Sequence, residues 1–164
     1  MPFTRPTTDI AKEGLFNILE NNISLEGIKT LDLFGGTGSI SYELASRGAA
    51  DLTIVEKDVK MAAFIRSKID ELKIDNCRVE KNDVFRFLES CNEKFDFIFG
   101  GPPYALKTID ELPRIITRKQ LLADGGWFIL EHTPANNYEQ EKLFKAVRHY
   151  GTTLFSIFIN NSPS

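Results

Sequence analysis

The sequence predicts an α/β domain built on a mainly parallel sheet with helices on both faces. Short apolar segments of strand length alternate with segments of helical spacing along almost the whole chain. The apolar segments are nearly continuous, which is typical of parallel strands that are buried on both faces. With 164 residues, of which 42% are hydrophobic and 26% charged, the chain suits one folded domain over residues 1–164.

The first half of the chain opens with a helix and continues with two strand–helix units. Thr7 and Thr8 are candidate N-caps for a helix whose apolar residues, from Ile10 to Ile23, share one face. The next segment has the order strand, glycine loop, helix, with the loop at 35–38. After the first helix we expect strands at 30–34 and 52–56 and helices at 39–47 and 59–72.

The second half continues the same alternation to the end of the chain. We expect strands at 78–80, 95–99, 127–131 and 154–159, and helices at 84–88, 109–122 and 138–147. In a sheet of this kind, ligands bind beyond the carboxyl ends of the strands. Candidate site residues are therefore those that directly follow each predicted strand.

Charge and cysteine content exclude several classes of protein. Twenty basic against 23 acidic side chains give a net charge of −3, so bulk charge does not attract this chain to nucleic acid. The start of the chain lacks the apolar stretch of a signal peptide, and Cys77 and Cys91 are too few for a disulfide framework. We expect a cytoplasmic monomer with no membrane segment and, because His132 and His149 lie far apart, no metal site.

The glycine loop and the acid after the second strand together favour a nucleoside-type cofactor. The loop consists of Phe34, Gly35, Gly36, Thr37 and Gly38. Taken alone, it is explained equally well by a ligand that approaches the backbone and by a tight turn with no ligand. A dinucleotide fingerprint would need a third glycine where Ser41 stands, so a nicotinamide dehydrogenase is disfavoured. Asp32 precedes the loop and can face an amine-bearing ligand. Glu56, beside Lys57, lies about 20 residues further on, where an acid that binds ribose hydroxyls is expected.

The ends of the third and fourth strands add candidates for binding a base. Asn82, Asp83 and Val84 can offer a carboxylate and a backbone amide to an adenine edge, and Asp83 can also act as a helix N-cap. The segment FDFIFGGPPY ends in two prolines that fix the backbone and a tyrosine, Tyr104, that can stack on a planar base. Its position after a buried strand favours this interpretation over a polyproline-like turn.

The order of these motifs resembles a known family. DLFGGTG, VEKD, NDV and PPY together resemble the class I S-adenosylmethionine-dependent methyltransferases that modify exocyclic amines. TRPTTDIAKEGLFNIL, SRGAA and the pair Glu131–His132 narrow the resemblance to the bacterial 16S ribosomal RNA guanine-N2 methyltransferases. The resemblance implies a Rossmann-like fold with a seven-stranded sheet, S-adenosylmethionine as cofactor, and ribosomal RNA or the small ribosomal subunit as partner.

The same resemblance assigns roles to individual residues. Asp32, Gly36, Gly38, Glu56 and Asp83 would line the cofactor pocket, together with the residues beside them in each motif. The amine-binding motif would be Gly101, Pro102, Pro103 and Tyr104, and substrate contacts are expected at Arg5, Thr7, Tyr104, Glu131 and His132.

The chain departs from the family pattern at two places. Gly101 stands where an aspartate or asparagine side chain usually accepts a hydrogen bond from the target amine. Weak or absent activity, a substitute acceptor such as Glu131, and an engineered or erroneous position all explain this glycine, and Gly101→Asp is expected to raise methyl transfer. Only Met1, Pro2 and Phe3 precede the TRPTTD block, so we expect the chain to lack a leading basic hairpin.

Three alternatives remain beside methyl transfer to a guanine amine of ribosomal RNA. The first is an inactive homologue that binds S-adenosylmethionine or RNA. The others keep the chemistry but change the substrate to an amine of DNA or to a protein amide, which related Pro-Pro-Tyr enzymes modify.

Overall fold

The computed structural model describes residues 8–161. Five helices and seven strands occur in this part of the chain; they alternate as far as β5, and β6 and β7 then follow with no helix between them. The helices are α1 (Asp9–Asn22), α2 (Ser39–Ser46), α3 (Val59–Glu71), α4 (Val84–Ser90) and α5 (Glu111–Arg118). The strands are β1 (Lys29–Leu33), β2 (Asp51–Glu56), β3 (Cys77–Lys81), β4 (Phe95–Gly100), β5 (Leu122–His132), β6 (Phe144–Tyr150) and β7 (Thr153–Ile159).

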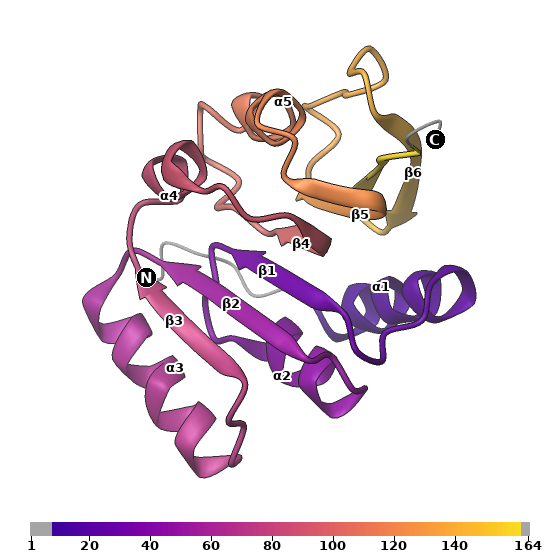
Figure 1. Ribbon diagram of the computed structural model, residues 1–164. Coiled ribbons are helices and arrows are strands. Elements are labelled where there is room, and N and C mark those ends of the chain that lie inside the picture. The colour runs from indigo at the N-terminus through magenta and orange to yellow at the C-terminus, as the bar shows by residue number, and fades with distance from the viewer. Residues whose placement is uncertain (1–7, 162–164) are drawn as a thin grey trace.

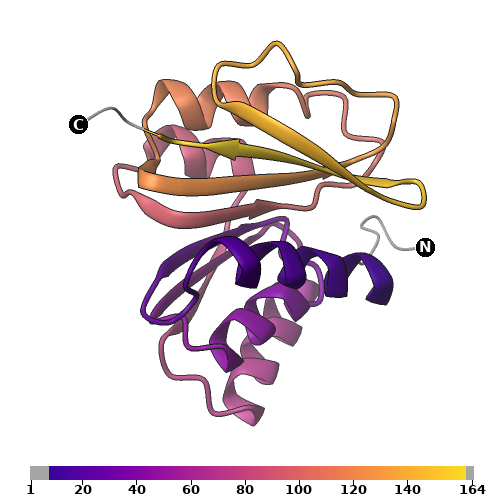
Figure 2. The ribbon, with the colours of Figure 1, turned by 90° about the vertical axis from the view of Figure 1, so that its right-hand side faces the viewer.

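One seven-stranded sheet forms the centre of the molecule, in the order β3-β2-β1-β4-β5-β7-β6. The pairs from β3 to β5 are parallel, and β7 runs antiparallel to both β5 and β6. Figures 1 and 2 show α1, α2 and α3 on one face of the sheet and α4 and α5 on the other. The predicted α/β class, with a mainly parallel sheet and helices on both faces, is confirmed.

Each face of the sheet has its own apolar core because alternate strand residues point to opposite sides. Leu31, Leu33, Ile98 and Leu130 face α4 and α5 in one buried cluster. Phe97, Phe99 and Ile129 pack with α1 and α2 in the other. This alternation decides which strand residues reach which side of the site described below.

The first helix begins where the sequence predicts. The Thr8 hydroxyl accepts a hydrogen bond from the Ala11 N–H at 3.2 Å, as an N-cap does. The helix then approaches β6 so closely that a Cβ on Gly14 would overlap the ring of Tyr150. A glycine in the middle of this helix therefore reflects close packing.

The predicted helix at 138–147 is wrong. The structure has turns after Tyr138 and then the strand β6, which pairs antiparallel with β7. β7 is buried along most of its length, and its backbone groups need partners on both sides. Strand pairing therefore overrides the helical spacing of the apolar residues in this segment.

Two further boundaries differ from the prediction. The helix expected at 109–122 is shorter, because Gln120 adopts a left-handed conformation (φ 55°) after α5 ends. β5 then begins at Leu122 rather than Trp127, and the register of its pairing with β4 shifts near Gly125, whose φ is 77°. The exposed Asp124 and the two glycines Gly125 and Gly126 interrupt the apolar pattern and concealed the start of this strand.

Candidate functional site

The glycine loop lies between β1 and α2 and holds several residues in left-handed conformations. Phe34, Gly36 and Gly38 have φ values of 63°, 59° and 84°. The Gly35 N–H donates to the Val55 carbonyl at 3.0 Å, and a Cβ on Gly35 would overlap the Ile54 side chain, so the loop packs tightly on β2. A Cβ on Gly36 would meet only the Phe34 carbonyl oxygen, at 3.8 Å. The loop therefore offers bare backbone to open space at Gly36.

Glu56 ties this loop to the start of α3. Its side chain is only 6% exposed. Oε1 accepts a hydrogen bond from the Gly36 N–H at 2.9 Å, and Oε2 accepts one from the Asp58 N–H at 2.9 Å. Each carboxylate oxygen has a second lone pair, so the residue expected to bind ribose also builds the loop that would face it.

Asp32 lies beneath the loop, on the face of the sheet that carries α2. Its Oδ2 accepts a hydrogen bond from the Ser41 hydroxyl at 2.8 Å, and the side chain is 2% exposed. Burial, with a smaller contribution from the charge of Glu56, raises the pKa of Asp32 from 3.8 to about 7, against the opposing effect of the Ser41 hydrogen bond. Ser41, in the first turn of α2, was not among the residues expected at the site from the sequence.

The third strand brings a further acid to the same edge. The Asn82 N–H donates to the Glu56 carbonyl at 3.2 Å, which fixes the segment after β3 beside the end of β2. Asp83 caps α4, because its Oδ1 accepts hydrogen bonds from the N–H groups of Phe85 and Arg86. Both side chains are half-buried, whereas the following Val84 is buried in the core. Lys57, also expected at the site, is exposed.

The Pro-Pro-Tyr segment follows β4 in the middle of the sheet. The Gly101 N–H extends the ladder by donating to the Leu33 carbonyl at 3.4 Å, and Pro102 is buried. Pro103 closes a turn by accepting a hydrogen bond from the Leu106 N–H at 3.0 Å. The segment therefore leaves the sheet directly beside the end of β1 and the glycine loop.

Tyr104 reaches across to the end of β5. Its hydroxyl donates to Glu131 Oε2 at 3.0 Å and lies 3.3 Å from Thr153 Oγ1. Glu131 is 3% exposed, so this contact is largely dry. Thr153 comes from the start of β7, and only the antiparallel pairing of that strand, which local sequence does not reveal, brings it here.

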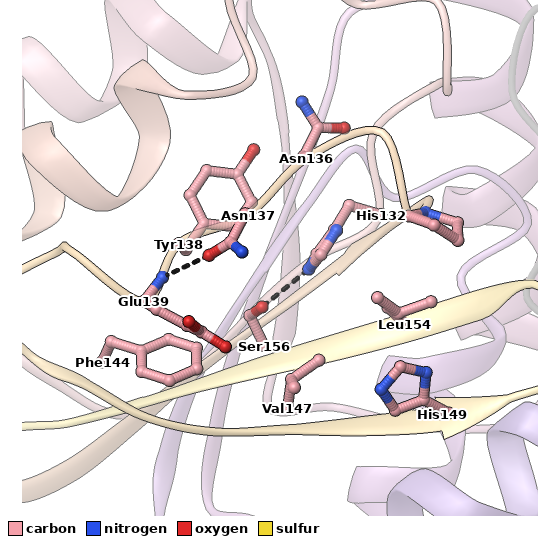
Figure 3. Close-up of a pocket in the computed structure, with 11 residues that line it drawn as sticks. His132, Asn136, Asn137, Tyr138, Glu139, Phe144, Val147, His149, Leu154 and Ser156 are labelled. Atoms are coloured by element: carbon pink, nitrogen blue, oxygen red, sulfur yellow. Dashed lines mark hydrogen bonds between the residues drawn. The ribbon is translucent and has the colours of Figure 1, made fainter.

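His132 lies on the other face of the sheet from Glu131. It lines a pocket of about 240 Å³ between the loop after β5 and the β6–β7 hairpin, which Figure 3 shows. The Thr133 carbonyl can only accept, so Nδ1 donates to it at 2.8 Å and Nε2 accepts from the Ser156 hydroxyl at 2.6 Å. Burial lowers the pKa of His132. The structure thus separates His132 from Tyr104 and Glu131, although all three were expected to bind substrate.

The remaining expected residues lie along one edge of the sheet. The strands β1 to β5 are neighbours in the sheet, and their carboxyl ends carry, in chain order, the glycine loop, Glu56, Asp83, Gly101 and Glu131. Arg5 and Thr7 lie outside the described residues. Within residues 8–161, no helix is long and apolar enough to span a bilayer, and no group of three or more potential metal ligands occurs.

Comparisons with known proteins place this chain in a family. Residues 1–159 match the model of the family described as Conserved hypothetical protein 95. The chain belongs to this family. The resemblance to ribosomal RNA methyltransferases noted in the sequence is borne out by the names of similar proteins. One is Ribosomal RNA small subunit methyltransferase D of Escherichia coli, 32% identical over 126 residues, which are 77% of this chain and 60% of that protein.

A second relative agrees with the family assignment, and a solved structure agrees with the fold. YlbH of Bacillus subtilis is 33% identical over 133 residues, which are 79% of this chain and 71% of YlbH. An RNA methyltransferase from Salinibacter ruber, solved in complex with S-adenosyl-L-homocysteine, superposes with a TM-score of 0.73 over 98% of this chain and 96% of that one, at 13% identity. The Rossmann-like class I methyltransferase fold expected from the sequence is confirmed.

Proposed function

We propose that this family member is an S-adenosylmethionine-dependent methyltransferase that acts on the exocyclic N2 amine of a guanine in 16S ribosomal RNA. The observation that carries the proposal is the edge of the sheet where a glycine loop held by Glu56 lies beside a Pro-Pro-Tyr segment. Similar proteins carry the name of ribosomal RNA small subunit methyltransferases. A cofactor loop and a base-binding segment on adjacent strands are the arrangement that methyl transfer to a base requires.

The residues of the loop fit the cofactor. The open space beside Gly36 admits a ligand against the backbone, where any side chain would intrude. The second lone pairs on Glu56 suit a pair of ribose hydroxyls, and Asn82 and Asp83 are close enough to border the adenine. When bound, S-adenosylmethionine supplies an electrophilic methyl group on a sulfonium.

The chain's own residues supply position and hydrogen bonds. The lone pair of an exocyclic amine is delocalised into the base, so an acceptor on its N–H makes the nitrogen a better nucleophile. The carbonyl of Pro102 is one such acceptor, and Tyr104 offers a ring on which the base can stack. Holding nitrogen and methyl in line supplies much of the remaining rate enhancement.

A second candidate function follows from Gly101. A protein with this loop but without a side chain at position 101 could bind S-adenosylmethionine and RNA without transferring the methyl group. Removing one positioned polar group typically lowers the rate by about 10²–10³. The two functions differ only in turnover, so a direct transfer assay separates them.

The test uses the full chain, tritiated S-adenosylmethionine and small ribosomal subunits from a strain that lacks the corresponding methyltransferase. Digestion and mass spectrometry then locate the label. We expect N2-methylguanine in 16S RNA. Label on another base or on protein would refute the substrate assignment, and cofactor binding without label would favour the inactive homologue.

A further inference from the structure

Position 101 has a carboxylate beside it, supplied by the adjacent strand. Gly100 pairs with Leu130 in the parallel ladder between β4 and β5, so Gly101 and Glu131 are the next residues on neighbouring strands. If residue 101 carried a Cβ, that atom would lie 3.6 Å from Glu131 Oε1. A carboxylate oxygen on an aspartate stands two bonds of about 1.5 and 1.2 Å beyond its Cβ. Glu131 Oε1 therefore borders the space that an acidic side chain at position 101 would enter.

The surroundings leave little room for both side chains. The same Cβ would lie 3.0 Å from Cε2 of Phe99, which is closer than ordinary contact, and Phe99 is buried. An aspartate at position 101 would press on this ring and would place its charge beside that of Glu131. Glycine at position 101 thus leaves the space beside Glu131 Oε1 clear of a side chain from β4.

Glu131 is also the buried carboxylate best placed for a base that stacks on Tyr104. The buried acids among the described residues are Asp32, Glu56 and Glu131. Asp32 contacts α2 and Glu56 holds the glycine loop, whereas Glu131 accepts the hydrogen bond of the Tyr104 hydroxyl itself. The Tyr104 hydroxyl, which also lies 3.3 Å from Thr153 Oγ1, donates to Oε2, and Oε1 lies on the side of Gly101.

We propose that the Glu131 carboxylate is the acceptor for the target amine and performs the role that a side chain at position 101 cannot. This inference rests on the proposed function. In the reaction, the N2 lone pair forms the new N–C bond, the C–S bond breaks with its electron pair going to sulfur, and the N–H proton passes to Glu131 and then to water. Tyr104, through its hydrogen bond to Oε2, is a positioning residue.

A fixed carboxylate also discriminates between bases. Guanine presents N1–H and N2–H donors side by side on one edge, whereas adenine presents an acceptor at N1 beside its amine. Carboxylate oxygens only accept hydrogen bonds when ionised, so Glu131 attracts the guanine edge and opposes the adenine edge. The inference therefore links Glu131 to the choice of guanine as well as to the rate.

The test compares four proteins: the parent, Glu131→Gln, Gly101→Asp and the double variant that carries both changes. Glutamine keeps the volume of the native side chain and can still accept from Tyr104, so folding is preserved. We expect kcat of Glu131→Gln to fall about 10²–10³-fold, while cofactor affinity measured by calorimetry is unchanged. Gly101→Asp alone should not raise the rate, which reverses the expectation from sequence, whereas the double variant should recover part of the lost rate.

Two rate outcomes would overturn the inference while leaving the proposed function intact. One is a Glu131→Gln rate within threefold of the parent. The other is a rise of tenfold or more on introducing Gly101→Asp into the parent, which would show that the acceptor belongs at position 101. In contrast, binding of cofactor with no transfer by any of the four proteins would refute the proposed function.

A binding measurement tests the inference without turnover. With S-adenosylhomocysteine present, guanosine and inosine monophosphates are titrated and followed by NMR, since inosine lacks the N2 amine. We expect the parent to prefer guanosine monophosphate and Glu131→Gln to lose that preference. No preference in the parent, including no binding of either nucleotide, would overturn the role of Glu131. Tyr104→Phe should reduce the preference less than Glu131→Gln, because it leaves the carboxylate in place.

Discussion

Replacing Asp32 with asparagine should make the protein more stable at neutral and alkaline pH but not in acid. The carboxyl group is 2% exposed, and its burial raises its pKa to about 7 in the folded protein from an ordinary 3.8. The asparagine side chain would occupy the same volume and could still accept the hydrogen bond of Ser41. The substitution therefore removes an ionisable group with little other change.

The size of the effect follows from the difference between the two pKa values. Below pH 3.8 the group is protonated in both states and contributes nothing. As the pH rises towards 7, the unfolded chain loses this proton while the folded protein keeps it, so stability falls. Each pKa unit corresponds to about 1.4 kcal/mol, so the loss reaches about 4 kcal/mol and is complete once the folded group ionises, above pH 7.

Urea unfolding of both proteins between pH 4 and pH 8 measures this difference. The free energy of unfolding of Asp32→Asn minus that of the parent should rise steadily with pH and level off near pH 8. Ser41→Ala removes a hydrogen bond that favours the ionised form of Asp32. The stability of that variant should therefore continue to fall to a higher pH than the stability of the parent does. A difference between Asp32→Asn and the parent that stays constant over the whole range would refute the argument.

Three other predictions concern the loop and the first helix. Gly36→Ala and its control Gly27→Ala each place a methyl group on a left-handed residue without a clash, so each protein should lose about 1–2 kcal/mol of stability. In calorimetry, only Gly36→Ala should also weaken cofactor binding, by about tenfold or more. Equal cofactor affinities of the two variants would contradict the assignment of the loop. Glu56→Gln supplies only one acceptor oxygen for two N–H groups, so urea unfolding should show a loss of stability of about 2 kcal/mol. Calorimetry should show weaker binding of the cofactor to this variant. Gly14→Ala should lower stability by about 1–3 kcal/mol because its Cβ meets the Tyr150 ring, and thermal unfolding should show a smaller loss when Tyr150 is also changed to leucine.

The parallel part of the fold could be predicted because most strands there are apolar runs that end in a recognisable turn or helix cap. β1 ends at a glycine loop, and α3 and α4 begin at the capping residues Asp58 and Asp83. Such signals are local. β6 lacks one: its residues are half-buried or exposed without a regular alternation, and the segment is a strand because it pairs with the buried strand β7 at the edge of the sheet.

The sequence allowed the candidate site residues at the strand ends to be predicted, but not the hydrogen bonds that these residues make. The position of Glu56 could be expected from its distance along the chain from the loop, whereas its two backbone hydrogen bonds could not. His132 illustrates the opposite case. It is adjacent to Glu131 in sequence, yet strand alternation sends the two side chains to opposite faces, and His132 binds Ser156 instead.

Gly101 shows why a departure from a sequence motif cannot be judged along the chain alone. A motif counts consecutive residues, but the chemistry needs an acceptor at one place beyond the sheet, and any neighbouring strand end can supply it. The ladder that pairs Gly100 with Leu130 brings residue 131 beside residue 101, thirty positions away. The bare backbone of Gly101 and the carboxylate of Glu131 therefore lie side by side, and the adjacent strand offers an acceptor where the motif has none. The double variant of Gly101 and Glu131 carries a carboxylate at position 101 instead of position 131, and recovery of activity there would distinguish a substitute acceptor from a lost one.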